Sequence, residues 1–362
     1  MITFLDLIKK EDFREFVSKR IAGVAGKSYS FPVSFPKLYR YRSLSSYAID
    51  DIINNKITLS SIGEFNDIFD GAIHQYGSKQ EIEEAAEEKW TRMEAMRINA
   101  HLPEGLLQRE DIVNPYIIHF TKESLYRFRM LDYLGTYVCC FSIDNTSTLM
   151  WAHYADSNKG VCIEYDFNEL PVENLLRKSI FPVAYTTEPI SVADLINDNG
   201  HQIYQYPLDA AVLCTALNKS SIWQYEKEWR FVWVLSSSSE VVRRITINSI
   251  VPPARICLGY HFLKPFFYYN YNDTNEIQKC TEAIYKFIDL ICFLCNNNIP
   301  VAIMIPSVGS YHLNPCEIPT NKLYCFMIQQ FRDKQPVSMR YYYTIHDHLM
   351  NLIDKTDEST HV

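Results

Sequence analysis

Glycine is scarce in this sequence, with 11 residues in 362 positions, about half of the roughly 7% that is usual. This scarcity excludes collagen-like and glycine-rich repeat architectures and disfavours chemistry built on several glycine-lined phosphate loops. A basic surplus is also missing, because 35 Lys and Arg face 43 Asp and Glu for a net charge of −8. That balance disfavours a general nucleic-acid coat protein and leaves only a local basic groove open. Since no segment approaches the roughly 20 apolar residues of a membrane-spanning helix, we expect no membrane association.

Apolar and aromatic residues are plentiful, at 47% and 14% of the chain, which is enough to build a sizeable core. Ten cysteines occur, several of them inside apolar runs, and this placement is typical of reduced, buried thiols. The first residues meet charge too early for a signal peptide. We therefore expect a cytoplasmic protein.

Short β-branched and aromatic runs alternate with helical patterns along the chain, and they predict an α+β fold with a twisted, mostly antiparallel sheet and inserted helices. Strands are expected at 37–42, 57–61, 137–143, 161–165, 228–235, 241–247, 255–260 and 299–305. A helix over 275–295 would complete a βαβ-like unit with the last two strands, and four serines at 236–239 predict a hairpin. We expect the main domain at 30–305, an N-terminal helical accessory at 1–29 and a C-terminal accessory segment at 306–362.

Residues 79–100 are predicted to form a helix with an acidic face that includes Glu81, Glu84, Glu87 and Glu88. A charge run of this kind is typical of a solvated surface. Two other segments, 266–271 and 341–343, are rich in aromatics without interleaved Lys or Arg. They favour an interface with a protein partner or a second copy over a nucleic-acid stacking surface.

Four segments carry polar residues that core packing does not require. They contain Arg40 and Arg42; Ser60 and Ser61 with Asn66 and Asp67; Trp151, His153 and Tyr154 with Asp156; and Glu226, Glu228 and Arg230. Alternation along a strand places Arg40 and Arg42 on one face, and it places the two glutamates on the same face as Arg230. The pattern is explained either by a buried salt-bridge network between these arginines and glutamates or by a functional site.

The chain resembles an uncharacterised bacterial family, the domain-of-unknown-function family 2971, over about residues 37 to 305. The stretches that carry the resemblance are Leu38–Ser43, Phe65–Asp70, Cys140–Ser142, Leu149–Ala155, Lys159–Tyr165, Lys219 and Glu226–Arg230. The family brings no settled activity with it.

A fainter resemblance does imply chemistry. An Arg on a first strand, a Ser on a second strand and a later Glu-x-Glu are together similar to the ADP-ribosyltransferase pattern. The resemblance implies that Glu228 holds the ribose hydroxyls, that Glu226 orients or deprotonates the acceptor, and that Ser60 braces the nicotinamide ribose. Arg40 or Arg42 would then pair with the diphosphate, which suits a planar guanidinium.

In such enzymes NAD is the substrate, and positive charge develops on the ribose as nicotinamide leaves, so a nearby carboxylate is needed. The expected NAD-binding set also includes Asn66, Asp67, Trp151, His153 and Tyr154, and of these the Trp and Tyr rings could stack on nicotinamide. The resemblance implies an NAD-consuming ADP-ribosyltransferase or NAD glycohydrolase-like enzyme with a macromolecular acceptor. A toxin or phage-defence effector is a role that such bacterial enzymes often have.

Two alternatives stay open. A Mg²⁺-dependent nuclease would use hard oxygen ligands, and the candidates are Asp67, Asp70, His153, Asp156, Glu164, Asp166, Lys219 and Glu226. A non-catalytic module would instead use the polar segments to bind a nucleotide or a protein, with the Asn66–Asp67 and His153–Tyr154 pairs pinning loops by hydrogen bonds.

Overall fold

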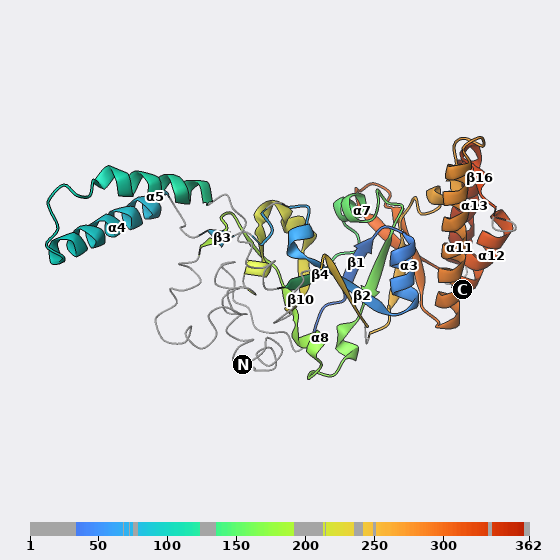
Figure 1. Ribbon diagram of the computed structural model, residues 1–362. Helices are drawn as coiled ribbons and strands as arrows, with labels where there is room; N and C mark the ends of the chain where they lie inside the picture. The colour runs from blue at the N-terminus through green and yellow to red at the C-terminus, as the bar shows by residue number, and fades with distance from the viewer. Residues whose placement is uncertain are drawn as a thin grey trace.

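The computed structural model describes residues 34–67, 69–71, 73–74, 79–123, 135–191, 213, 215–234, 242–248, 251–331 and 335–357 (Figure 1). The helical accessory expected at 1–29 lies outside the described residues. The serines expected to form a hairpin turn, 236–239, lie outside them as well.

Among the residues that the structure describes, a ten-stranded sheet forms the main body. Its main path runs through β11 (Arg244–Asn248), β2 (Lys56–Ser61), β4 (Thr136–Ser142), β1 (Leu38–Arg42), β5 (Val161–Tyr165), β12 (Arg255–Leu258), β14 (Val301–Pro306) and β15 (Leu313–Ile318). Off this path, β10 (Glu228–Val234) pairs with β4 and with β6 (Ile180–Pro182). The β12–β14 pair is parallel and the other pairs of this sheet are antiparallel. The predicted α+β fold with a mostly antiparallel sheet is therefore confirmed, whereas its likeness to ADP-ribosyltransferases stays a prediction.

Helices lie beside the sheet and beyond its ends. They are α3 (Ser46–Ile53), α4 (Lys79–Asn99), α5 (Arg109–Glu123), α7 (Thr148–Tyr154), α8 (Leu175–Lys178), α11 (Thr274–Asn296), α12 (Thr320–Gln330) and α13 (Tyr342–Asp357), with 3-10 turns η1 (Ile62–Glu64), η2 (Phe167–Glu169), η4 (Ser221–Glu226), η5 (Lys264–Phe266) and η7 (Met339–Tyr341). Three small ladders join β3 (Ile73–His74) to β8 (Ile190–Ser191), β7 (Ala184–Thr186) to β9 (Asn218–Ser220), and β13 (Phe267–Tyr268) to β16 (Val337–Ser338). Within the described residues, no helix is long and apolar enough to cross a membrane.

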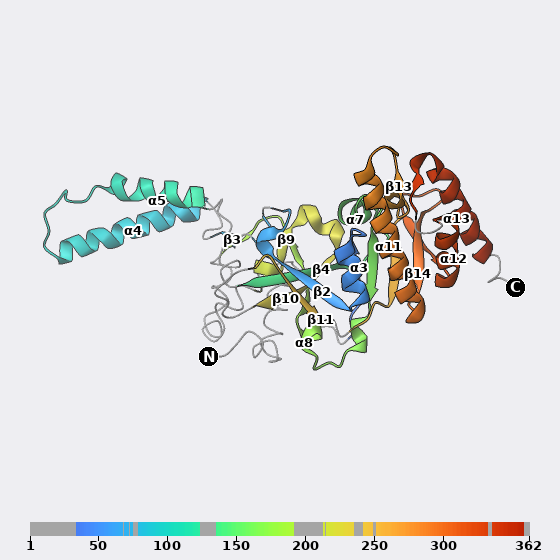
Figure 2. The same cartoon turned by 45° about the vertical axis from the view of Figure 1, so that its right-hand side comes forward.

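The two faces of the sheet are covered differently. On one face, α3 and α11 pack side by side over the large apolar core, to which Leu38, Phe141 and Phe231 contribute (Figure 2). On the other face, a smaller cluster joins Tyr41 of β1 to Trp151 of α7, with their rings edge to face at 5.3 Å. The parallel β12–α11–β14 connection confirms the predicted βαβ-like unit.

The predicted hairpin between 228–235 and 241–247 is wrong. The strand β10 pairs with β4 on one side and with β6 on the other. Because both of its edges are thereby occupied, β11 pairs instead with β2.

The C-terminal part of the chain extends the main sheet and packs against its helices. The strand β15 extends the main sheet beyond β14, and α12 packs against α11. The boundary expected at residue 305 stays a prediction, although this strand belongs to the same sheet as the residues before it.

Candidate functional site

The strand β10, which pairs with β4, carries charged side chains on the face of the sheet away from the large core. Glu228 lies opposite Ser142, and Arg230 lies opposite Cys140 in the antiparallel register. Alternation sends Trp229, which lies between them, and the following Phe231 toward the large core on the other face. The shared face predicted for Glu228 and Arg230 is therefore confirmed.

Arg230 is the centre of a buried ion cluster and has no exposed surface. Its two terminal nitrogens donate to Asp70 at 2.7 and 2.6 Å, and Nε donates to Glu228 Oε1 at 2.9 Å. Arg230 also donates to the carbonyl of Ala216 at 2.6 Å. A buried guanidinium is tolerated because its donors are satisfied in this way.

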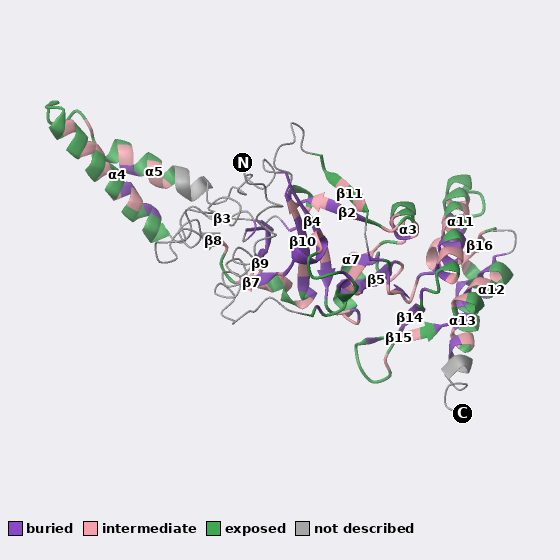
Figure 3. Cartoon of the chain, turned by 90° about the horizontal axis from the view of Figure 1, so that it is seen from below, coloured by how far each residue is buried: buried purple, intermediate pink, exposed green. Residues whose placement is uncertain are grey.

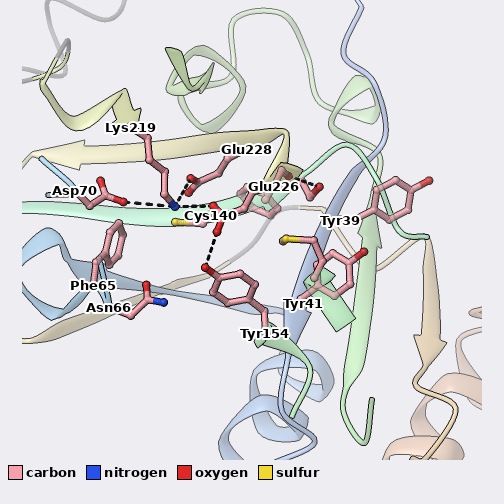
Figure 4. A pocket seen from close by; sticks show the side chains of 13 residues that line it. Tyr39, Tyr41, Phe65, Asn66, Asp70, Cys140, Tyr154, Lys219, Glu226 and Glu228 are labelled. Carbon is pink, nitrogen blue, oxygen red and sulfur yellow. Dashed lines mark hydrogen bonds and ion pairs between the residues drawn. The ribbon is translucent and has the colours of Figure 1, made fainter. Parts of the chain in front are cut away.

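Lys219 of β9 joins the same cluster. Its ammonium nitrogen donates to Glu226 Oε2 at 2.5 Å and to Glu228 Oε2 at 3.1 Å, and it lies 3.6 Å from Asp70 Oδ2 (Figure 4). Three carboxylates and two cations thus share one buried cluster, which leaves one net negative charge when all five groups are ionised.

The backbone between the two glutamates brings both carboxylates to the same ammonium. Glu226 ends η4, and Lys227 follows it in the left-handed region with φ of 46°, which is uncommon for a non-glycine residue. The hydroxyl of Ser142 donates to the carbonyl of Glu226 at 2.6 Å, and the hydroxyl of Tyr185 accepts from the backbone nitrogen of Glu228 at 2.8 Å. The predicted period-2 strand over 226–230 is therefore replaced by a turn that leads into a strand.

The environments of the two glutamates move their pKa values apart. Burial alone would raise the pKa of Glu228, but Arg230 and Lys219 outweigh it and lower the pKa to about 2. Burial raises the pKa of Glu226, Lys219 opposes that rise, and the charge of Glu228 adds to it. Two close carboxylates with separated pKa values are the arrangement that enzymes use to divide acid and base roles.

Tyr154 and Asn66 connect the ion cluster to α7 and to the loop after η1. The hydroxyl of Tyr154 donates to Glu226 Oε1 at 2.5 Å. Burial and this bond to Glu226 raise the pKa of Tyr154, while a side-chain hydrogen bond with Asn66 opposes the rise. Glu226 therefore accepts bonds from Tyr154 and from Lys219, one at each oxygen.

A pocket of about 190 Å³ opens on this cluster. Its lining residues are Tyr39, Tyr41, Phe65, Asn66, Asp70, Cys140, Phe141, Ser142, Met150, Tyr154, Lys219, Glu226 and Glu228 (Figure 4). Aromatic rings and carboxylates dominate this list, and Lys219 is the single cation among the described lining residues. The volume lies below the roughly 300–1,000 Å³ of pockets that enclose drug-sized ligands, so the pocket suits one small ring system.

The structure does not bring Arg40, Arg42 and Ser60 to this pocket. The register of β1 directs Tyr39 and Tyr41 toward the pocket and the two arginines toward the opposite face. Arg40 donates to the carbonyl of Thr58 at 2.5 Å, and Arg42 donates to Asp51 of α3, also at 2.5 Å. The expectation that these arginines meet Glu226 and Glu228, in one cleft or in one salt-bridge network, is corrected on this geometry. Ser60 lies opposite Val138 of β4 and is not a lining residue either.

The aromatic segment of α7 divides between the pocket and its surroundings. Tyr154 lines the pocket, whereas Trp151 is fully buried beside it and donates from Nε1 to the carbonyl of Asn145 at 2.7 Å. His153 is exposed, and its Nδ1 lies 3.1 Å from the hydroxyl of Tyr225.

The two loop residues that were predicted for the site, Asn66 and Asp67, also differ in their positions relative to the pocket. Asn66 lines the pocket, but Asp67 does not, and Asp67 Oδ1 accepts instead from the backbone nitrogen of Phe69 at 2.9 Å. Asp67 therefore supports the loop from which Asn66 reaches the pocket.

For two pocket residues, Asp70 and Cys140, the sequence did not predict the role that the structure shows. The sequence predicts Asp70 as a metal ligand, yet it is the carboxylate to which the guanidinium of Arg230 donates. Cys140 belonged to a family motif and lines the pocket as a free thiol. Burial, followed by the nearby charge of Glu228, raises the pKa of Cys140 far above its ordinary value, so the thiol is unreactive. A pairwise contact between distant segments leaves no local signal in the sequence.

The residues proposed for a magnesium site are dispersed. Glu164 of β5 accepts from Lys37 at 2.6 Å and from Arg255 at 2.9 Å, away from the pocket lining. Among the residues that the structure describes, no group of three or more His, Cys, Asp or Glu is placed to hold a metal ion.

Comparison with known proteins gives one family match. Residues 150–231 match the family described as "Protein of unknown function (DUF2971)". No curated protein and no solved structure matches the chain. The matched segment runs from α7 to β10 and contains Tyr154, Lys219, Glu226, Glu228 and Arg230, which are most of the ion cluster and its hydroxyl donor. The family resemblance predicted from the sequence is thus supported over residues 150–231, where the chain is similar to DUF2971.

Proposed function

We propose that the pocket binds the nicotinamide ring of NAD and that Glu226 assists cleavage of the bond between nicotinamide and ribose. The observation that carries the proposal is the pairing of two carboxylates with separated pKa values at an aromatic pocket of ring size. The chain would then be an NAD glycohydrolase or ADP-ribosyltransferase. A role as a toxin or phage-defence effector is a further proposal that the pocket leaves open.

The charge of the site favours a cationic ring. The cluster carries one net negative charge when fully ionised, and the rings of Tyr39, Tyr41 and Phe65 line the pocket. Aromatic faces attract cations, and the pyridinium ring of NAD is a planar cation. Because Lys219 is engaged with Glu226 and Glu228, the described lining offers no uncommitted cation for a diphosphate. The diphosphate would therefore lie outside this pocket, which revises the role expected for Arg40 and Arg42.

The chemistry needs one carboxylate to accept a proton. The C1′–N1 bond breaks, and its electron pair goes to the ring nitrogen, so nicotinamide leaves as a neutral molecule. The positive charge passes to the ribose, where the net negative cluster stabilises it. Water, or a hydroxyl of an acceptor, attacks C1′ and gives its proton to Glu226, which releases it to solvent. With water, the products are nicotinamide, ADP-ribose and a proton.

The two glutamates have different roles in this proposal. Glu226 has a raised pKa and contacts the hydroxyl of Tyr154, so it is the proton acceptor. Glu228 stays ionised, and its oxygens accept from Arg230 and Lys219. Its contact with the ribose, which the family resemblance implied, remains a prediction.

The experiment is the release of free nicotinamide from NAD, followed by chromatography. We expect turnover by the wild type and a loss of about 100-fold or more in Glu226→Gln, as for removal of a general base. The control is Arg42→Met, which changes a cation on the opposite face of the sheet and should keep nicotinamide release within about 3-fold. Equal release by Glu226→Gln and wild type refutes the proposal, provided that both variants unfold cooperatively.

Binding without turnover is the second candidate. This candidate is favoured by the ion pairs of Glu228, whose carboxylate contacts both Lys219 and Arg230. A buried carboxylate held by two cations is typical of a structural role. In that case NAD or a related nucleotide binds to the wild type and no nicotinamide is released. Calorimetry beside the chromatographic assay separates the two functions.

A further inference from the structure

The helices α4 and α5 form a hairpin, called here the arm, which extends away from the sheet (Figures 1 and 2). The two helices pack against each other, and among the described elements α4 has no other extensive contact. Ile82, Ala86 and Val113 are the buried apolar residues of the arm whose side chains are described. Two-helix packing of this size adds little stability by itself.

The far end of the arm is coloured exposed in Figure 3, and several residues of the arm are both exposed and apolar. The exposed set is Met96, Ile98, Leu102, Leu106 and Ile118. Exposed apolar groups gathered on a projecting element mark an interaction surface. The arm therefore resembles two helices of a larger helical bundle whose remaining helices would come from a partner.

One stripe of α4 is self-complementary. Glu81, Ala85, Glu88, Arg92 and Met96 follow one another at spacings of three or four residues, so they share one side of the helix. This side turns away from the α5 contact made by Ile82 and Ala86. Glu88 and Arg92 are 73% and 72% exposed, and within the helix they form an ion pair of 3.0 Å, which pairing with a second copy would exchange for contacts between the copies. The predicted solvated acidic face is therefore confirmed at Glu88, and it merges into a basic and then an apolar region.

From this stripe we propose that the arm pairs with the arm of a second copy of the chain, with the two α4 helices antiparallel. A two-fold axis placed between residues 88 and 92 sets Glu88 opposite Arg92 of the second copy, and the same pair forms again across the axis. Ala85 then lies opposite Ala95, where small side chains allow a close approach. Glu84 lies opposite Met96 of the second copy, so the acidic half of each helix meets the apolar and basic half of the other.

The size of the arm suits this interface. The 21 residues of α4 span about 31 Å at 1.5 Å per residue. Two adjacent helices are roughly 18 Å wide, so one face of the arm offers about 550 Å², or about 1,100 Å² for two copies. This value passes the roughly 1,000 Å² that a specific interface needs.

Charge exchange tests the proposal, with the mass of the full chain measured by sedimentation equilibrium. We expect a wild-type dimer. Glu88→Arg and Arg92→Glu should each weaken the dimer by about 10-fold or more, because each single change places like charges together across the axis. The double variant Glu88→Arg with Arg92→Glu restores both pairs and should return the dissociation constant to within about 3-fold of wild type.

The matched control is Glu83→Arg, which reverses an exposed charge on another side of the same helix. It should leave the dimer unchanged, and circular dichroism confirms that all variants keep their helices. A wild-type chain that stays monomeric at every concentration overturns the proposal, including one that binds only a different protein. A dimer whose dissociation constant is unchanged by both single charge reversals overturns it as well. Nicotinamide release is independent of this result, since the arm contributes no residue to the pocket lining.

Discussion

Glu228→Gln should destabilise the fold through the loss of one buried charge. The pKa of Glu228 falls from 4.5 to about 2 in the folded protein because of Arg230 and Lys219. A lowered pKa contributes stability above the unfolded value, and that contribution is lost as the pH falls toward the folded value. The difference of about 2.5 units corresponds to about 3 kcal/mol at pH 7, and linkage reduces it to about 2 kcal/mol at pH 3.5.

Urea unfolding of wild type and Glu228→Gln at both pH values measures this difference. The control is Glu317→Gln, because Glu317 is 70% exposed and its ion pair with Arg255 is long, at 3.4 Å. Such a surface pair contributes about 1 kcal/mol or less. A loss below about 1 kcal/mol at pH 7 for Glu228→Gln, or a loss that grows as the pH falls, would refute the reasoning.

Three further changes test the same cluster. Lys219→Met should lower the free energy of unfolding by about 3–5 kcal/mol, because it leaves the buried Glu226 without a cation and takes one of two cations from Glu228; a loss under about 1 kcal/mol in urea unfolding contradicts this. Tyr154→Phe removes a hydrogen bond that lowers the pKa of Glu226, so the acidic limb of the pH profile of nicotinamide release should move to higher pH, and a move to lower pH is the opposite of this expectation. Cys140 should resist alkylation in the folded protein because burial raises its pKa; mass spectrometry should find it labelled far more slowly than the exposed Cys325, and equal rates contradict a raised pKa.

Local patterns predicted the strands well, because β-branched and aromatic runs differ in period from helices. The expected strand at 137–143 is β4, and the expected helix at 275–295 is α11. The pairing of the strands was harder to predict from the sequence, since β10 and β11 are neighbours in the chain but not in the sheet. Their separation depends on which strand edges are already occupied, and that is decided by distant residues.

The site was predicted in part for a related reason. Alternation correctly separates the tyrosines of β1 from its arginines, but the sequence does not reveal which side of the strand faces the pocket. The aromatic pair Tyr39 and Tyr41 faces it, while Arg42 is held by Asp51 of α3. Glu226 and Glu228 were identified, but their shared bond to Lys219 depends on a left-handed turn at Lys227 that few non-glycine residues adopt.

A crystal structure of the Glu226→Gln variant soaked with NAD tests the central claim most directly. The account predicts the nicotinamide ring among Tyr39, Phe65 and Tyr154, with C1′ of the ribose facing residue 226 and the diphosphate outside the pocket. NAD bound against Arg40 and Arg42 on the opposite face of the sheet, or an empty pocket at saturating NAD, would contradict it.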